Sequence, residues 1–78
     1  MEQLTEKQLT GAFKKNRRQV ETVKSGVDVL IRDREDLVLA ARGIVPFTVI
    51  AELLGVDRRT VYDYLARAKG RQQRETVQ

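Results

Sequence analysis

The reactive side chains of this sequence are carboxylates, amines, guanidinium groups and two phenols, and the two most versatile catalytic side chains are absent. Its 78 residues include no His and no Cys. The chain therefore has no imidazole base, no thiolate nucleophile, no disulfide and none of the usual nitrogen or sulfur ligands of a structural zinc site. No spacing in the sequence sets a nucleophile beside a base. We expect no enzyme activity, no bound metal and no cofactor.

The excess of positive charge indicates a binding function instead. The chain carries 15 basic and 11 acidic residues, for a net charge of +4 at pH 7. Residues 1–26 carry six basic and three acidic side chains, residues 46–78 carry six and four, and the middle of the chain is slightly acidic. Because phosphate groups attract such basic ends, this balance favours a polyanionic partner. The alternative is that the basic residues only line solvated helix faces.

The sequence has no pattern of a membrane or secretion segment. No apolar run approaches the roughly 18 residues that a membrane-spanning helix needs. The polar start, Met1-Glu2-Gln3, is unlike a signal peptide. We therefore expect a cytoplasmic protein that has no membrane partner, and the positive charge described above favours association with the nucleoid.

Apolar spacing predicts an all-α fold, beginning with a long amphipathic helix. Thr5 and Gln8 match a capping box, so this helix is expected to begin between them. Gly26 is expected to break it, because glycine costs about 1 kcal/mol relative to alanine inside a helix. Asp28 is then available to cap a new start. A continuous helix through Gly26 is the alternative.

Glycines and a proline divide the rest of the chain into three further helices. A glycine ends a helix readily and a proline suits a first turn, so the boundaries are expected at Gly43, Pro46, Gly55 and Gly70. The helices between them are predicted to cover residues 28–42, 47–54 and 58–69. The predicted domains are a basic amphipathic helix that can serve in dimerisation (1–27), a helical core (28–70) and a flexible polar tail (71–78).

The segment from Phe47 to Arg67 resembles the helix-turn-helix unit of DNA-binding proteins. The small Ala51 suits a close crossing of two helices, and Gly55 permits the left-handed backbone of a turn of about three residues. Apolar residues stand where the inside of this corner must be buried: Ile50, Leu54, Val56, Val61 and Leu65. Residues 55–65 are especially similar to the homeodomain-like units of bacterial and phage regulators and of recombinase DNA-binding domains. The resemblance implies a trihelical helix-turn-helix core over residues 28–70, preceded by the amphipathic helix.

The resemblance also implies that residues 58–69 form a recognition helix in the major groove of double-stranded DNA. Arg58 and Arg59 would then donate to guanine O6 and N7 or neutralise phosphates. The Asp63 carboxylate would orient Arg59 or Arg67, each four residues away, or accept from cytosine N4, and we favour the orienting role. Tyr64 is expected in the core. The residues expected to contact DNA are Arg58, Arg59, Thr60, Tyr62, Asp63, Arg67, Lys69 and Arg71. The last two resemble an arm that enters the minor groove, but for the segment that holds them we favour a flexible solvated tail.

Residues 6–25 lie outside the resemblance and allow two interpretations. Their apolar residues form a heptad seam with one polar member, which suits a homodimer whose register is set by Asn16. The seam comprises Leu9, Phe13, Asn16, Val20 and Val23. In the other interpretation, the helix folds back over the trihelical unit as a fourth core helix. We favour the homodimer, because two joined units gain affinity through effective concentration and read two half-sites.

These features together predict a small sequence-specific protein that binds double-stranded DNA. It would regulate transcription by occupying its site, as a repressor of bacterial or bacteriophage type. One alternative is a DNA-architectural, recombination or partition accessory factor with the same fold. Another is a module that binds no DNA and docks on a protein partner through its N-terminal helix.

Overall fold

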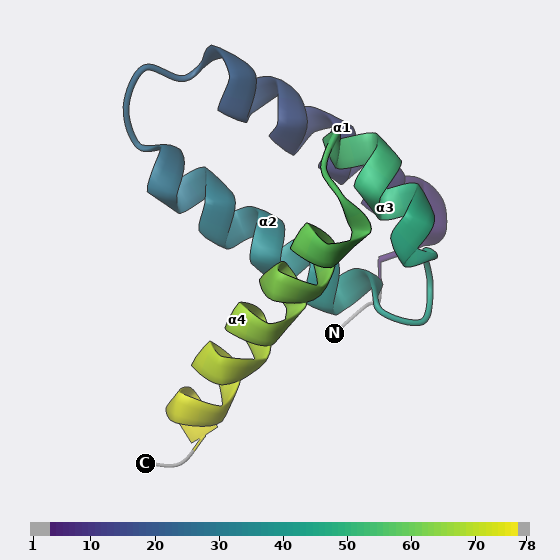
Figure 1. Ribbon diagram of the computed structural model, residues 1–78, viewed down its shortest axis with the longest axis vertical. Coiled ribbons are helices and arrows are strands. Elements are labelled where there is room, and N and C mark those ends of the chain that lie inside the picture. Colours follow the sequence, from purple (N-terminus) through teal and green to yellow (C-terminus); the bar gives the residue numbers. More distant parts are fainter. Residues whose placement is uncertain (1–3, 77–78) are drawn as a thin grey trace.

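The computed structural model describes residues 4–76, and these residues form four helices and no strand. The helices are α1 (Glu6–Thr22), α2 (Val27–Ala41), α3 (Phe47–Leu54) and α4 (Arg58–Thr76) (Figure 1). The predicted all-α fold is therefore confirmed. Within the described part of the chain, no helix combines the length and the hydropathy that crossing a membrane requires.

Short-range contacts explain where α1 begins and where it ends. The Thr5 hydroxyl accepts a hydrogen bond from the Gln8 N–H at 3.1 Å, and the Gln8 side chain accepts one from the Thr5 N–H at 2.9 Å. The predicted capping box is thus present. α1 ends at Thr22, and Gly26 takes a left-handed conformation (φ 78°) directly before α2. The predicted break is confirmed, but Asp28 lies in the first turn of α2 and does not cap it.

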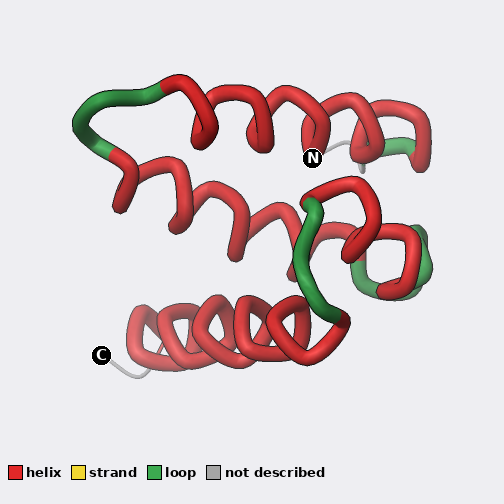
Figure 2. The backbone as a smooth tube through the Cα atoms, turned by 45° about the horizontal axis from the view of Figure 1, so that its top comes forward, coloured by secondary structure: helices red, strands yellow, loops and turns green. Residues whose placement is uncertain are grey.

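α1 and α4 pack on opposite sides of α2 (Figure 2). α1 packs against α2 and α3, and α4 packs against the same two helices. In Figure 2, α2 lies between α1 and α4, and α3 closes the end of the molecule at which α2 finishes. All four helices contribute to one apolar core, and its largest fully buried side chains are Leu9, Phe13, Val38, Ile50 and Val61.

α1 belongs to the core of its own chain. Leu9 and Phe13 are fully buried and Asn16 is 3% exposed. These three side chains are not offered to a second copy or to a protein partner, so the prediction of a homodimer seam through them is wrong. α1 folds back as the fourth core helix because three helices alone would leave apolar faces of α2 and α3 in water. The other two predicted seam residues, Val20 and Val23, are partly exposed near the end of α1.

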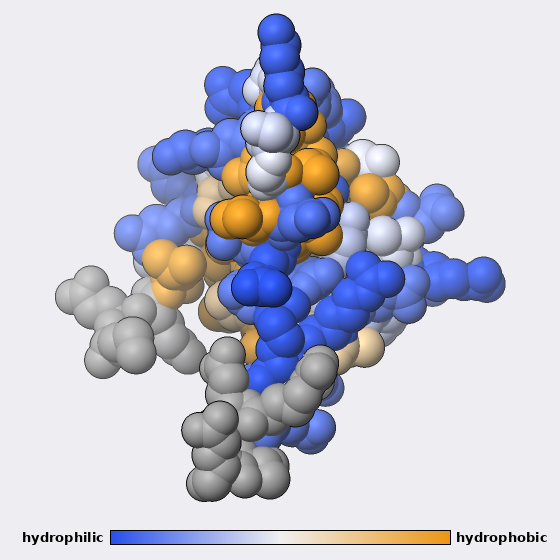
Figure 3. All heavy atoms as spheres, turned by 90° about the vertical axis from the view of Figure 1, so that its left-hand side faces the viewer, coloured by the Kyte–Doolittle hydropathy of each residue, from blue (hydrophilic) through white to orange (hydrophobic). Residues whose placement is uncertain are grey.

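The end of the molecule at which α1 and α2 are joined keeps part of its apolar surface. Val27 is 42% exposed and Val29 is 63% exposed, both in the first turn of α2. Figure 3 faces this end and shows an apolar area surrounded by hydrophilic side chains. The core therefore stops short of the turn between these two helices.

α4 is longer than the sequence predicts. It passes through Gly70 and continues to the end of the described residues, whereas we expected a stop at Gly70 and a frayed tail over residues 71–78. Arg71 explains the difference, because its guanidinium donates to the carboxylates of Glu35 and Asp36 on α2. Such contacts offset the roughly 1 kcal/mol that a glycine costs inside a helix. Residues 77 and 78 of the predicted tail lie outside the described residues.

Candidate functional site

A three-residue connection joins α3 to α4. The Val56 N–H donates to the Ala51 carbonyl at 3.0 Å and the Gly55 N–H donates to the Glu52 carbonyl at 3.3 Å, which are the two hydrogen bonds of a Schellman motif. This motif requires a left-handed residue, and Gly55 supplies it with a φ of 70°. The chain then enters α4 directly after Asp57, whose carbonyl accepts the first helical hydrogen bonds. The start of α4 is therefore held beside the end of α3.

The inner side of this corner is apolar and closely packed. Four of the five residues predicted to fill it are buried and the fifth, Val56, is partly exposed; the buried ones are Ile50, Leu54, Val61 and Leu65. Ala51, predicted at the close helix crossing, is also buried. Tyr64, which was predicted to lie in the core, is 7% exposed. Because the inward positions of α4 are filled, the positions between them face outward.

The outward face of α4 carries most of the residues that we predicted to contact DNA. Thr60 is partly exposed, and Arg58, Arg59, Tyr62, Asp63, Arg67 and Lys69 are exposed. The Tyr62 ring meets the Phe47 ring edge-on, with 4.9 Å between centroids and 72° between planes, while Tyr62 remains 53% exposed. This contact lets α3 hold one side chain of the outward face in place.

The first turn of α4 carries two arginines that form no ion pair among the described residues. Neither Arg58 nor Arg59 takes part in the ion pairs of the described residues, which are Arg17–Glu21, Arg67–Glu35, Arg71–Glu35 and Arg71–Asp36. The first turn of α4 also contains no acidic residue. Cations at a helix N-terminus oppose the helix dipole, so this arrangement is unfavourable for the isolated helix. Both guanidinium groups are available to an anionic partner.

Glu35 of α2 holds two of the arginines that we predicted to contact DNA. Its side chain is 6% exposed, accepts from Arg71 and lies 3.6 Å from Nη1 of Arg67. Asp36 pairs with Arg71 at 2.6 Å. Hydrogen bonds to Glu35 and then to Asp36 raise the pKa of the Arg71 guanidinium. Arg71 is therefore not a free minor-groove arm, because a buried carboxylate needs its partner.

The pairing of Arg67 with Glu35 does not agree with the role that we favoured for Asp63, which was to orient Arg59 or Arg67. Asp63 forms no ion pair with Arg59 or Arg67 among the residues described. Arg67 pairs instead with Glu35, whose burial strengthens the attraction because fewer waters screen it. Asp63 is exposed and does not orient a neighbouring arginine. Its carboxylate is left available to a ligand.

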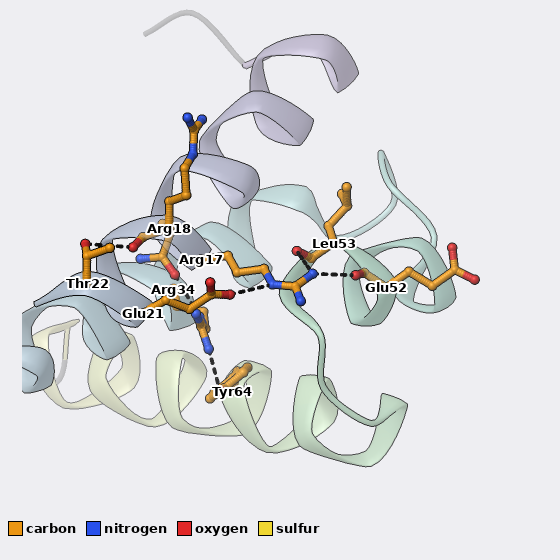
Figure 4. Close-up of polar contacts among 9 residues, drawn as sticks. Arg17, Arg18, Glu21, Thr22, Arg34, Glu52, Leu53 and Tyr64 are labelled. Atoms are coloured by element: carbon orange, nitrogen blue, oxygen red, sulfur yellow. Dashed lines mark hydrogen bonds and ion pairs between the residues drawn. The ribbon is translucent and has the colours of Figure 1, made fainter.

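Arg17 of α1 is a residue near the site that sequence reasoning missed. Its Nη1 lies 3.5 Å from the carbonyl oxygens of Glu52 and Leu53 at the end of α3, and its Nε donates to Glu21 at 2.9 Å (Figure 4). A Cβ added to Gly55 would stand 2.9 Å from the Arg17 guanidinium. Arg17 therefore covers the turn between α3 and α4, where a cation suits the negative end of the α3 dipole. Helical spacing alone carries no signal for this long-range contact.

A buried polar network sets the position of α4 relative to α1 and α2. The Arg34 Nε donates to the Asn16 side chain at 2.7 Å, and the Asn16 amide donates to the Leu30 carbonyl at 2.9 Å. The Arg34 Nη1 donates to the Tyr64 hydroxyl at 3.3 Å, and its guanidinium lies 5.8 Å from the centre of the Tyr64 ring (Figure 4). Arg34 is 5% exposed. The network joins three helices and buries a guanidinium whose hydrogen-bond acceptors are neutral.

No family model, curated protein or solved structure matches this chain. Its function is therefore inferred from its own residues. The described part of the chain contains no group of three or more acidic residues that could hold a metal ion. The candidate site is the outward face of α4, which we define by Arg58, Arg59, Tyr62, Asp63 and Ala66, all of them exposed.

Proposed function

We propose that this protein binds double-stranded DNA through the outward face of α4, with α3, the turn at Gly55 and α4 acting as a helix-turn-helix unit. We further propose that it regulates transcription as a repressor, by occupying its site and excluding polymerase. The observation that carries the proposal is that Arg58 and Arg59, in the first turn of α4 and shortly after the left-handed Gly55, form no ion pair within the described part of the chain.

The electrostatics of this first turn support a polyanionic partner. Two cations at the positive end of a helix dipole are repelled by the dipole and by each other, and neither forms an ion pair with Asp57, the acidic residue directly before that turn, among the described residues. An anion at the same place is attracted by the exposed guanidinium groups and by the dipole together. Phosphates of a DNA backbone supply that charge, and guanine O6 and N7 accept two hydrogen bonds from one arginine.

Regulation by occupancy asks only for a folded unit that stays on its site. The four helices share one core, so the helices beside α4 support the binding face. A bound protein that blocks polymerase needs no effector-binding domain. Specificity would come from a few side chains on α4, and phosphate contacts would add affinity for any sequence.

Two experiments test this proposal. Bound duplexes are selected from a random DNA pool, and affinities are then measured by mobility-shift titration at two salt concentrations. We expect an enriched motif, and we expect Arg59→Ala to relax base preference at one position of it. Arg18→Ala is the matched control, because Arg18 is exposed on α1 and its side chain points away from α4 (Figure 4). That variant should change the affinity for all sequences by the same factor or leave it unchanged. Failure to bind any duplex at low salt would refute the proposal.

A further inference from the structure

We propose that Asp63 is a specificity-determining residue whose carboxylate accepts a hydrogen bond from the exocyclic amino group of a cytosine in the major groove. This inference rests on the proposed DNA-binding function and adds the identity of one base contact. It assigns a partner to the one acidic side chain of the outward face.

Asp63 stands in the middle of the outward face. Arg59 precedes it by four residues and Ala66 follows it by three, so these side chains lie in one row along the helix. All three are exposed. The opposite side of α4 is buried through Val61 and Tyr64. Whatever α4 binds through this face therefore meets the Asp63 carboxylate directly.

The structure leaves this carboxylate without a compensating cation. Both arginines that could pair with it along the helix, Arg59 and Arg67, form no ion pair with it among the described residues. Arg67 is engaged by Glu35 at 3.6 Å, and Glu35 is fixed in place because it is buried and also binds Arg71. The neighbouring arginine is thus directed towards α2. An unpaired acid remains in a surface that is otherwise basic.

An unpaired acid on a DNA-binding face lowers affinity unless the DNA offers it a hydrogen-bond donor. Phosphates repel it, and base acceptors such as guanine O6 and N7 cannot bond to it. In the major groove, the N4 amino group of cytosine is the donor that Asp and Glu commonly recognise, and one good base contact is worth about 5- to 150-fold in discrimination. Where the base is cytosine, the hydrogen bond from N4 therefore offsets the repulsion between the Asp63 carboxylate and the phosphates, and the protein prefers cytosine at that position.

Arg59 and Asp63 would then read neighbouring base pairs. Residues four apart in a helix are separated by about 6 Å along its axis, which is close to two base steps of about 3.4 Å each. Arg59 offers donors and Asp63 offers acceptors. We therefore expect the cytosine read by Asp63 to lie within about two base pairs of the guanine read by Arg59.

The test is to select sequences from a random duplex pool with the wild type, Asp63→Ala and Asp63→Asn, and to measure affinities for the selected motif. Asp63→Ala should bind the wild-type motif about 5- to 150-fold more weakly and lose the cytosine preference at one position only. Asp63→Asn should shift that position from cytosine to adenine, because Asn pairs with adenine N6 and N7. Asp33→Ala is the matched control for loss of one negative charge, since Asp33 is exposed on α2 and has no ion pair among the described residues.

Two results separate failure of this inference from failure of the proposed function. If Asp63→Ala binds every sequence as tightly as the wild type or more tightly, with an unchanged motif, Asp63 reads no base and the inference is overturned while DNA binding stands. If the wild type selects no motif and binds no duplex, the proposed function fails, and the base contact fails with it. Because Asp63 is exposed, thermal unfolding should give the same midpoint for the wild type and both variants.

Discussion

Replacing Asn16 by Leu distinguishes the folded-back α1 from the dimer seam that its sequence pattern suggests. In a coiled-coil seam, a buried Asn lowers stability and sets register, so a Leu in its place would strengthen the dimer. In the structure, Asn16 is 3% exposed and binds both the Arg34 side chain and the Leu30 carbonyl. Leu has a similar shape but cannot make either hydrogen bond. The two arrangements therefore predict opposite changes in stability.

The size of the loss follows from the groups that would be left without partners. A buried charged donor without an acceptor costs about 2–3 kcal/mol, and the lost bond to the Leu30 carbonyl costs about 1 kcal/mol. Burying the Leu side chain returns about 1–2 kcal/mol. We expect Asn16→Leu to lower the free energy of unfolding by about 2 kcal/mol, which corresponds to a fall of about 8–16 °C in Tm for a domain of this size.

A double variant shows whether the Arg34 Nε–H, left without an acceptor, is the cause. Replacing Arg34 by Met, an apolar side chain of comparable length, removes the Nε donor that Asn16→Leu leaves without an acceptor, and a buried polar pair replaced on both sides is often neutral. Thermal and urea unfolding followed by circular dichroism should therefore show Asn16→Leu/Arg34→Met to be more stable than Asn16→Leu alone. The reasoning is refuted if Asn16→Leu raises Tm, or if its Tm rises with protein concentration as that of a dimer does.

Further predictions concern the turns and the end of α4. Gly55→Ala and Gly43→Ala should each cost about the 1–2 kcal/mol of a left-handed alanine. The two losses should be similar, because Gly43 has open space around it and the Arg17 guanidinium near Gly55 is the end of a flexible side chain that can move. Urea unfolding of both variants measures the losses. Arg71→Ala should lower the free energy of unfolding by about 1–2 kcal/mol and shorten α4, because Glu35 loses its closer partner. Hydrogen exchange of the last turns of α4 measures the shortening. Arg67→Ala is the control and should give a smaller loss. Since Glu35 raises the pKa of Arg71, the contribution of Arg71 is retained below its unfolded-state pKa and lost only in strong alkali, so the difference between the wild type and Arg71→Ala should not vary from about pH 6 to 9. A clear rise or fall across that range would contradict the assignment.

Features that depend on a few neighbouring residues could be predicted from the sequence. The capping box of Thr5 and Gln8 is formed, and the chain turns through left-handed glycines at Gly26, Gly43 and Gly55. Each of these features is decided within about four residues, by hydrogen bonds and backbone sterics that tertiary packing did not override. Helical periodicity likewise predicted that Tyr64 is buried.

The states of charged residues in the candidate site depended on contacts between distant parts of the chain. Arg67 and Arg71 pair with Glu35, which lies more than 30 residues earlier in the sequence. Their pairing leaves Asp63 free and extends α4 past the glycine at which it was expected to stop. An i, i+4 pair on an exposed helix is weak, so a buried carboxylate on a neighbouring helix prevails over it. The periodicity of one helix gives no information about an ion-pair partner on another helix.

The sequence by itself determined which side of each helix is apolar and where most of the helices begin and end, because both follow from residue type and local spacing. The tertiary structure decided what covers each apolar side. Leu9, Phe13 and Asn16 have the same pattern in a homodimer seam and in a folded-back helix, since apolar burial is non-directional and favours any surface of matching shape. α2 and α3 supply that surface within the same chain, and Arg34 supplies the polar partner that Asn16 requires.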